Sequence, residues 1–289
     1  MDDGSARLER LLGCAVRDVR NAGGQHGVRH YRLTLADGRA AFAKLAGDGG
    51  EAARAGFAAE ASGLRWLAAA GTAAVPEVLG SDDRSLVLAW IAEQTADRNA
   101  AARFGRELAA LHAAGADAFG APWPGVIASL PLPNAGGPSW PEWYVSQRVL
   151  PYLRLARDAG TLSRADVAVI ESAAARVSAA AGPAEPPSRI HGDLWAGNLL
   201  WSGGRGWLID PAAHGGHRET DLAMLALFGA PYLDQILAGY QEAAPLAEGW
   251  RQRVPLHQLH PLLVHVCLFG AAYREAALLA AHSTVRLAS

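Results

Sequence analysis

A change in hydrophobic pattern near Ile91 divides this chain into two parts with different folding requirements. Before it, the sequence has short alternating runs typical of strands, together with one Ala-rich segment over residues 51–70. After it, apolar residues recur mainly at the three- and four-residue spacing of helices. We therefore expect an α+β, bilobal chain. A small antiparallel-sheet lobe should span residues 1–91, and a larger, mainly helical lobe residues 92–289.

The small lobe is predicted to contain a hairpin, a helix and a buried strand. Arg29–Leu35 and Ala40–Leu45 alternate on either side of the turn Ala36–Arg39, which is a hairpin signal. Glu51–Ala70 contains no proline and carries apolar residues at helical spacing, so we expect a helix there. Ser85–Ile91 is an apolar run of strand length that should link the two lobes.

The larger lobe is predicted to consist of helices with one strand pair inserted. The helical regions expected are Arg103–Ala114, Trp140–Ala159, Ser163–Ala181 and the chain from Glu219 onward, broken near Gly229, Pro231, Pro245 and Pro255. Ser163 with Asp166 three residues later resembles a capping box. Ala118–Pro138 is rich in Pro and Gly and is expected to be a loop. Leu199–Trp201 and Trp207–Ile209 should be short strands.

Composition and charge argue against several functional classes. The chain has 26 basic and 28 acidic residues and a net charge of −2. No basic block is present, so neither nucleic-acid binding nor attraction to a membrane surface is expected. A chain of 289 residues is long enough to bury a core without disulfides, and 51% hydrophobic residues fit a globular protein. A monomer is the simplest expectation.

The cellular compartment is predicted from cysteine usage and from the apolar segments. Cys14 and Cys267 lie far apart and show no metal-ligand spacing, which favours two free thiols in a reducing compartment. The N-terminus opens acidic, unlike a signal peptide. The most apolar stretch, Pro261–Tyr273, is too short to cross a bilayer. We therefore expect a cytoplasmic protein.

The segment His191–Asn198, HGDLWAGN, is the most informative part of the chain. Asp193 and Asn198 are five residues apart, and Asp210 follows twelve residues later at the end of a predicted strand. Phosphoryl transfer needs a carboxylate to accept a hydroxyl proton and oxygen ligands to hold Mg²⁺ on the phosphates. Asp193 fits the first role, and Asn198 with Asp210 fits the second. The alternative is a purely structural role, in which Asp193 caps a turn and Asn198 is a turn residue.

Lys44 lies within an apolar strand pattern, and Glu60 follows sixteen residues later on the predicted helix. In a kinase layout, a strand lysine holds nucleotide phosphates and a helix glutamate orients it. Either residue alone could be a solvated surface charge. The downstream carboxylates favour the paired functional interpretation.

Two further segments are candidates for nucleotide contacts. Gly23, Gly24 and Gly27 lie in a turn upstream of Lys44, where backbone N–H groups could approach phosphates. Backbone groups of Ala89 and Ile91, on the linking strand, could face an adenine. An ordinary hairpin tip and an ordinary core strand would explain the same sequences.

Several other residues near the loop have more than one interpretation. His191 is more simply a buried structural histidine than a general base. Asp221 could simply cap a helix, or His217 and Asp221 together could shape the acceptor side of the cleft. Trp195, together with Trp140 and Trp143, could line a sugar site, although core packing accounts for most tryptophans.

The residues of this loop carry a specific resemblance. HGDLWAGN, with Leu194-Trp195 before Gly197, resembles the catalytic loop of the fructosamine kinase and ketosamine-3-kinase family. The stretch Ile209–Met224, IDPAAHGGHRETDLAM, is similar to that family's Asp-Pro segment and its Gly-His-x-Glu-x-Asp-Leu-Ala stretch. Matches in the same order lie upstream at Ala41–Leu45, Phe57–Leu67, Gly105–His112 and Phe119-Gly120. The resemblance extends from about Val19 to Tyr240.

This resemblance implies a protein-kinase-like fold related to aminoglycoside and choline kinases. It implies transfer of the ATP γ-phosphate, with Mg²⁺, to the sugar O3 of a ketosamine such as a fructosamine or ribulosamine. The phosphorylated adduct then falls apart, which reverses glycation. The substrate would be a small ketosamine or a glycated protein lysine.

Carried over residue by residue, the resemblance makes Asp193 the base, Lys44 and Glu60 the phosphate-positioning pair, and Asn198 and Asp210 the magnesium ligands.

One departure from the family concerns the glycine-rich turn. Many relatives place a cysteine where this chain has Gln25-His26, so redox control through the turn is not expected.

Two competing functions remain at this stage. Another small-molecule kinase of the same fold, of the aminoglycoside or choline type, would share His-Gly-Asp-x4-Asn. Trp195 and residues 216–223 favour the ketosamine branch, and a net charge of −2 gives little support for a polycationic acceptor. The other alternative is a catalytically inactive nucleotide-binding protein, although each candidate position carries a chemically competent residue.

Overall fold

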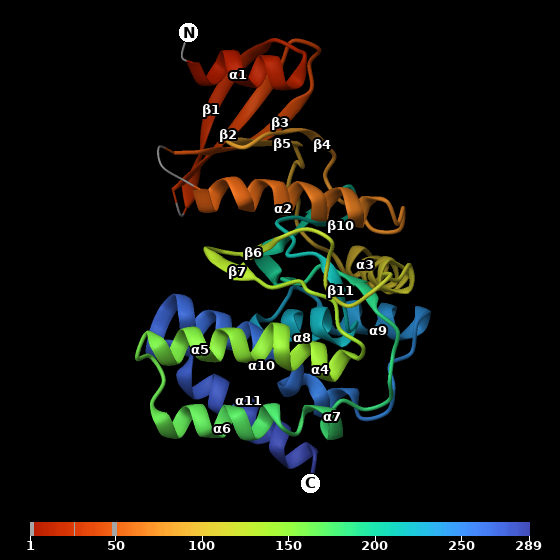
Figure 1. The fold of residues 1–289 in the computed structure, drawn as a ribbon. Helices are drawn as coiled ribbons and strands as arrows, with labels where there is room; N and C mark the ends of the chain where they lie inside the picture. The colour runs from red at the N-terminus through yellow and green to blue at the C-terminus, as the bar shows by residue number, and fades with distance from the viewer. Residues whose placement is uncertain (1–2, 26, 48–50) are drawn as a thin grey trace.

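The computed structural model describes residues 3–25, 27–47 and 51–289, and it confirms the α+β, bilobal arrangement (Figure 1). One end is an antiparallel sheet of order β1-β2-β3-β5-β4. Its strands are β1 (Val16–Gln25), β2 (Val28–Leu35), β3 (Ala40–Ala46), β4 (Val78–Ser81) and β5 (Ser85–Ala89). The predicted hairpin is the β2–β3 pair.

The sheet of the small lobe lies between two helices. Helix α1 (Asp3–Leu12) was not expected from the sequence, yet Leu8 is only 2% exposed and packs with Ala41 and Ala43 of β3. Helix α2 (Glu51–Ala68) covers the other face. Successive strand residues point to opposite faces, so Lys44, two residues from Phe42, is directed towards α2.

The large lobe is mainly helical, as predicted. Its helical segments are α3 (Arg98–Ala113), α4 (Trp140–Tyr144), a π-helical turn η1 (Val145–Val149), α5 (Leu150–Asp158), α6 (Arg164–Ala174), α7 (Val177–Ala180), η2 (Ala196–Asn198), α8 (Glu219–Phe228), α9 (Leu233–Ala243), α10 (Trp250–Phe269), η3 (Gly270–Tyr273) and α11 (Arg274–Leu287). The capping box of Ser163 and Asp166 at the start of α6 is confirmed.

Three strand pairs interrupt these helices. They are β6 (Gly125–Ile127) with β7 (Leu130–Leu132), β8 (Ser188–Ile190) with β11 (His214–Gly216), and β9 (Leu199–Ser202) with β10 (Arg205–Leu208). The last pair was predicted. The first lies inside the segment expected to be a loop, and the second joins strands more than twenty residues apart, a pairing that no local pattern reveals.

The break expected near Pro255 was wrong, because α10 runs through both Pro255 and Pro261. A proline inside a helix costs about 3 kcal/mol. Helix α10 offsets this by burying Leu256, Leu259 and Leu263 in the largest core cluster of the lobe. Tertiary burial therefore overrides the local helix-breaking signal.

One stretch, Trp250–Leu287, is long and apolar enough by composition to cross a membrane, with a mean hydropathy of 1.5. It is two helices, α10 and α11, joined by η3, and they pack against each other and against the rest of the large lobe.

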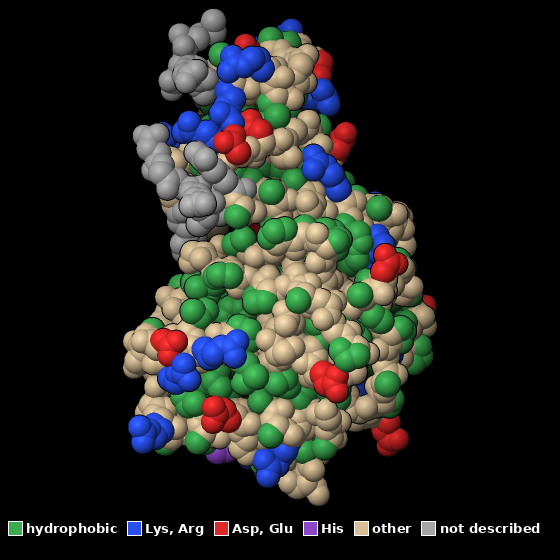
Figure 2. Space-filling model, in the orientation of Figure 1, with side chains coloured by type: hydrophobic (Ala, Val, Ile, Leu, Met, Phe, Trp, Pro, Cys, Tyr) green, Lys and Arg blue, Asp and Glu red, His purple; other side chains and the backbone are tan. Residues whose placement is uncertain are grey.

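The boundary between the lobes stays a prediction. Strand β5 ends at Ala89 and α3 begins at Arg98, which brackets the expected position at residue 91. On the face shown in Figure 2, Lys and Arg side chains are interspersed with Asp and Glu side chains.

Candidate active site

The loop that carries Asp193 is held at both ends by secondary structure. It leaves β8, which pairs with β11, and enters η2 and β9. Gly192 sits at φ = 82°, and a Cβ there would lie 2.3 Å from the carbonyl oxygen of Ala212. Only glycine fits this position, which explains the His-Gly-Asp sequence.

His191 uses both ring nitrogens to fix the loop. Its Nε2 donates to the carbonyl oxygen of Ile209 at 2.8 Å, and its Nδ1 accepts from the backbone N–H of Asp193 at 3.2 Å. Burial lowers the pKa of His191, so the ring is neutral at pH 7. The structure therefore gives His191 the structural role that the sequence favoured, and it links the loop to the segment before Asp210.

Asp221 anchors the same loop from helix α8. Its carboxylate accepts from the backbone N–H groups of His191 and Gly192 at 2.7 and 2.9 Å, and from Nε2 of His112 at 3.2 Å. Burial opposes ionisation, but these donors outweigh it and hold the pKa of Asp221 below its usual value. The side chain is fully buried. Asp221 therefore positions the loop. A buried carboxylate with these partners neither caps its own helix nor contacts an acceptor.

Replacing Asp221 with Asn should therefore lower both activity and stability. The amide would turn an NH₂ group towards backbone donors, and breaking such a buried charged network costs roughly 3 kcal/mol. We expect kcat to fall at least tenfold and the free energy of unfolding in urea to fall by that amount. Asp234→Asn, at an exposed position in α9, is the matched control. Wild-type stability in Asp221→Asn would contradict the anchoring role.

Asp193 and Asn198 form the centre of the candidate site. The Nδ2 group of Asn198 donates to Oδ2 and to the backbone oxygen of Asp193, at 2.9 and 2.8 Å. These bonds fix the carboxylate and leave its Oδ1 for another group. Burial raises the pKa of Asp193 to about 6, against the opposing bond from Asn198, and the negative charge of Asp210 adds to the increase. A pKa near 6 suits a base that works at neutral pH.

Lys44 joins the small lobe to Asp210, which lies two residues after the end of β10. Its Nζ donates to both oxygens of Glu60, at 2.8 and 2.9 Å, and to Oδ1 of Asp210 at 2.6 Å. The first pair matches the predicted strand–helix partnership. Lys44 is 7% exposed, and it is the only lysine in a sequence that otherwise uses arginine as its long basic side chain.

Burial and neighbouring charges shift the pKa values of Lys44 and Glu60. Burial raises the pKa of Glu60 to about 7, with Asp210 adding to the effect and Lys44 opposing it. The pKa of Lys44 is raised because its two carboxylate partners outweigh burial. Asp210 adopts φ = 53°, an unusual conformation for a residue other than glycine. Such residues concentrate at functional sites.

The glycine-rich turn lies where the sequence placed it, at the β1–β2 hairpin upstream of Lys44. Gly23 and Gly24 belong to the end of β1, Gly27 lies in the turn, and His26 falls outside the described residues. A Cβ at Gly24 would lie 2.4 Å from the carbonyl oxygen of Val28, so the close pairing here requires glycine. Contact with phosphates stays a prediction.

The linking strand restricts the predicted adenine contacts. The backbone N–H of Ala89 donates to the carbonyl of Glu77 at 2.8 Å, and that of Trp90 donates to Ala40 at 3.2 Å. The backbone N–H of Ala89 is therefore already engaged. The backbone N–H of Ile91, beyond the strand, remains the proposed donor to an adenine.

The remaining acceptor candidates differ in exposure. Trp195, within the loop that carries Asp193, is 40% exposed. His217 is buried and packs against Trp140 and His257, with ring centroids 4.9 and 4.8 Å apart. Burial lowers the pKa of His217 well below its usual value. Its placement is that of a core residue.

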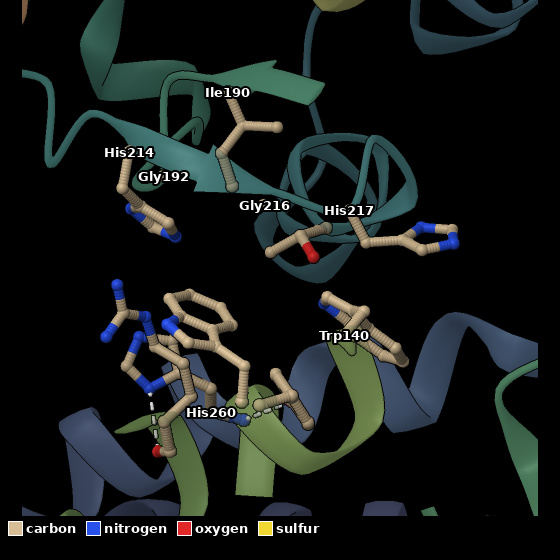
Figure 3. Close-up of a pocket in the computed structure, with 11 residues that line it drawn as sticks. Trp140, Ile190, Gly192, His214, Gly216, His217 and His260 are labelled. Carbon is tan, nitrogen blue, oxygen red and sulfur yellow. Dashed lines mark hydrogen bonds between the residues drawn. The ribbon is translucent and has the colours of Figure 1, made fainter. Parts of the chain in front are cut away.

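Behind the loop lies a cavity of about 10 Å³, shown in Figure 3, where His214 and Gly192 face His260 and Trp140 across the gap. This volume holds about one water molecule. Trp140 and Trp143 line it and are 4% and 2% exposed, so core packing, one of the two interpretations that the sequence allowed, accounts for them.

Within the described part of the chain, His217, Glu219 and His257 form the cluster whose geometry could hold a metal. Both oxygens of Glu219, however, accept from Arg253 at 2.6 and 2.9 Å in a buried pair. The guanidinium therefore already neutralises this carboxylate, and we assign the cluster to structure.

The fold itself defines a class. An aminoglycoside phosphotransferase solved with gentamicin has a TM-score of 0.65 at 15% identity, covering 99% of this chain and 96% of its own. A macrolide 2′-phosphotransferase from Brachybacterium faecium has a TM-score of 0.62 at 18% identity, covering 96% of both chains. The chain therefore has the protein-kinase-like fold of small-molecule kinases.

The family is shown by closer matches. The family model for fructosamine kinase matches residues 9–286, and the chain belongs to this family. A protein from Synechocystis, provisionally named a ketoamine kinase, is 36% identical over 76% of each chain. A solved structure from Thermobifida fusca, provisionally assigned as a fructosamine-3-kinase, is 51% identical, with a TM-score of 0.94 and 99% coverage of both chains.

Proposed function

We propose that this kinase transfers the γ-phosphoryl group of ATP to the O3 hydroxyl of ketosamines. The observation that carries the proposal is the convergence of Lys44 and Glu60 from the small lobe with Asp210 from the large lobe. This group is linked through His191 to the loop that holds Asp193. Family membership selects ketosamines among the acceptors used by this fold.

Asp193 accepts the proton of the acceptor hydroxyl. Its carboxylate is held by Asn198 and partly shielded from water, so its raised pKa makes it a better base than an ordinary aspartate. As the O3 oxygen forms its bond to the γ-phosphorus, the bond to the ADP oxygen breaks and the hydroxyl proton passes to Asp193.

Lys44 binds the nucleotide phosphates. Glu60 fixes the direction of the ammonium group, because both of its oxygens accept from Nζ. A lysine held in this way presents its charge without reorganising during the reaction, which is the main source of electrostatic catalysis.

Asn198 and Asp210 suit Mg²⁺. Both offer oxygen donors. The Nδ2 group of Asn198 is already bonded to Asp193, and the side chain of Asp210 is one-third exposed. When bound, the ion would neutralise phosphate charge. Lys44 Nζ now donates to Oδ1 of Asp210, and in this proposal the ion replaces Lys44 as the partner of that carboxylate.

The product would break down and release the amine, so the reaction would reverse glycation. Ribulosamines, fructosamines and glycated protein lysines are the proposed substrates. The proposed location is the cytoplasm, where both ATP and newly glycated amines occur.

A phosphorylation screen tests the function. Ribulose-, fructose- and erythrulose-linked lysine, an aminoglycoside and choline would each be incubated with ATP and Mg²⁺. We expect ADP release with the ketosamines, and ³¹P–¹³C coupling in the product at C3 of the sugar. Asp210→Asn should raise the Mg²⁺ concentration for half-maximal rate at least tenfold.

Two outcomes would contradict the proposal. Turnover with the aminoglycoside or choline alone would assign another acceptor class. ATP binding without ADP release on any acceptor would identify a nucleotide-binding protein.

A further inference from the structure

Five aromatic side chains form a continuous row that begins at the catalytic loop. The members of this aromatic row are Trp195, Phe228, His265, Phe269 and Tyr273. Neighbouring ring centroids along it are 6.2 Å (Trp195–Phe228), 5.1 Å (Phe228–His265) and 5.5 Å (His265–Phe269) apart. Tyr273 closes the far end, 4.7 Å from His265 and 5.9 Å from Phe269.

Three of the five members of the row are exposed, and His265 and Tyr273 are half-buried. Trp195 and Phe228 are each 40% exposed and Phe269 is 54% exposed, in a chain whose other large apolar side chains are mostly buried. Phe228 and Phe269 are the last residues of α8 and α10, and each is followed by a glycine with positive φ. Contiguous exposed apolar patches mark binding surfaces.

The position of Trp195 connects the row to the chemistry. It follows Asp193 by two residues, and its backbone N–H donates to the Asp193 carbonyl at 3.2 Å. Its ring lies over Gly197, where a Cβ would come within 2.3 Å of the indole. The ring is therefore seated on the catalytic loop itself.

We propose that the part of the row beyond Trp195, formed by Phe228, His265, Phe269 and Tyr273, binds the substituent on the amine nitrogen of the acceptor. The kinase would accordingly prefer ketoamines whose nitrogen carries an apolar or aromatic chain. This inference rests on the proposed function and adds the class of amine carrier to it.

The amine side of the acceptor fits the row better than the sugar tail does. Beyond O3, the sugar carries further hydroxyl groups, and aromatic faces would remove their hydration without replacing the hydrogen bonds. The other direction leads, two carbons on, to a secondary ammonium followed by the carrier chain. Ring faces attract such a cation and pack against methylene or aryl groups.

The charge state of the row agrees with a cationic occupant. Nδ1 of His265 donates to the carbonyl of Pro261 at 2.7 Å, and burial lowers its pKa, so the imidazole is neutral at pH 7. Arg274, next to Tyr273, is committed to Asp166 through two hydrogen bonds.

The test compares two fructosamines that differ only in the amine carrier, N-fructosyl-benzylamine and N-fructosyl-ethanolamine. We expect the wild type to show a kcat/KM at least tenfold higher for the benzylamine adduct. Phe228→Ala and Phe269→Ala should each reduce this ratio at least fivefold, mainly through a higher KM for the benzylamine adduct. Leu279→Ala, at a 60% exposed position on α11 outside the row, is the matched control and should keep the ratio.

Any result other than the expected one overturns the inference. The results also show whether the subsite alone or the proposed function as a whole is wrong. Turnover of both adducts with equal kcat/KM, or an unchanged ratio in both Phe variants, would reject the subsite while ketoamine kinase activity stands. A change of oligomeric state in the Phe variants with an unchanged ratio would show instead that the row joins copies of the chain. If neither adduct is phosphorylated, the proposed function falls, and the subsite with it.

Discussion

Replacing Asp193 with Asn is expected to lower kcat by about 10³-fold while the protein stays folded and still binds ATP. A positioned general base contributes roughly 10²- to 10⁴-fold, and an amide of the same shape cannot accept the hydroxyl proton. ADP release measured with a ketosamine acceptor, alongside nucleotide binding by calorimetry, would check both parts. Activity within tenfold of wild type would remove Asp193 from the role of base.

The same substitution should not destabilise the fold at neutral pH. Burial raises the pKa of Asp193 from 3.8 to about 6, so the folded state binds more protons than the unfolded state between these values. Stability contributed by this group therefore falls as pH rises through that window. Asn carries no charge, so at pH 7.5 the Tm of the variant should equal or exceed that of the wild type.

The wild-type pH profile follows from the same group. A base must be deprotonated, so kcat/KM should fall on the acid side with an apparent pKa near 6. Asp234→Asn, at an exposed position, should leave this profile unchanged.

Replacing Lys44 with Met is expected to lower kcat/KM by roughly 10²- to 10³-fold, the usual effect of removing one preorganised electrostatic contact. Met fills similar space without the charge that phosphates need. Glu60 and Asp210 would then face each other unpaired, so Glu60 should hold its proton to higher pH and stability should fall as pH rises. The double variant Lys44→Met/Glu60→Gln should recover stability without recovering activity.

The single lysine makes this prediction unusually direct to check. An acyl-phosphate analogue of ATP transfers its label to a lysine near the phosphates, and this sequence contains no lysine besides Lys44. We expect one labelled side chain, protected by excess ATP and absent in Lys44→Met. Labelling that ATP does not prevent would show that Lys44 lies away from the phosphates.

Much of the fold was predictable because its signals are local. The β2–β3 hairpin, α2, the capping box of α6 and the β9–β10 pair each follow from residues a few positions apart. Helix α1 was missed because only its packing of Leu8 against the sheet reveals its role. The helix through Pro255 was missed because burial overrode a local signal.

The candidate site shows the same division. Asp193, Asn198 and the Lys44–Glu60 pair were named from sequence, since each pair is separated by a short, regular spacing. The sequence left Asp221 either as a helix cap or as part of the acceptor site. The structure shows that it anchors the loop instead. This role was missed because its partners His191 and Gly192 lie thirty and twenty-nine residues away.

The sequence by itself determined which chemical groups this protein has and the order of its two lobes, because strand and helix patterns and short motifs depend on neighbours along the chain. Only the tertiary structure decided that Lys44 meets Asp210 across 166 residues, and that rings from the loop, α8, α10 and η3 form one row. Such contacts arise from the packing of whole elements, and no local spacing encodes them.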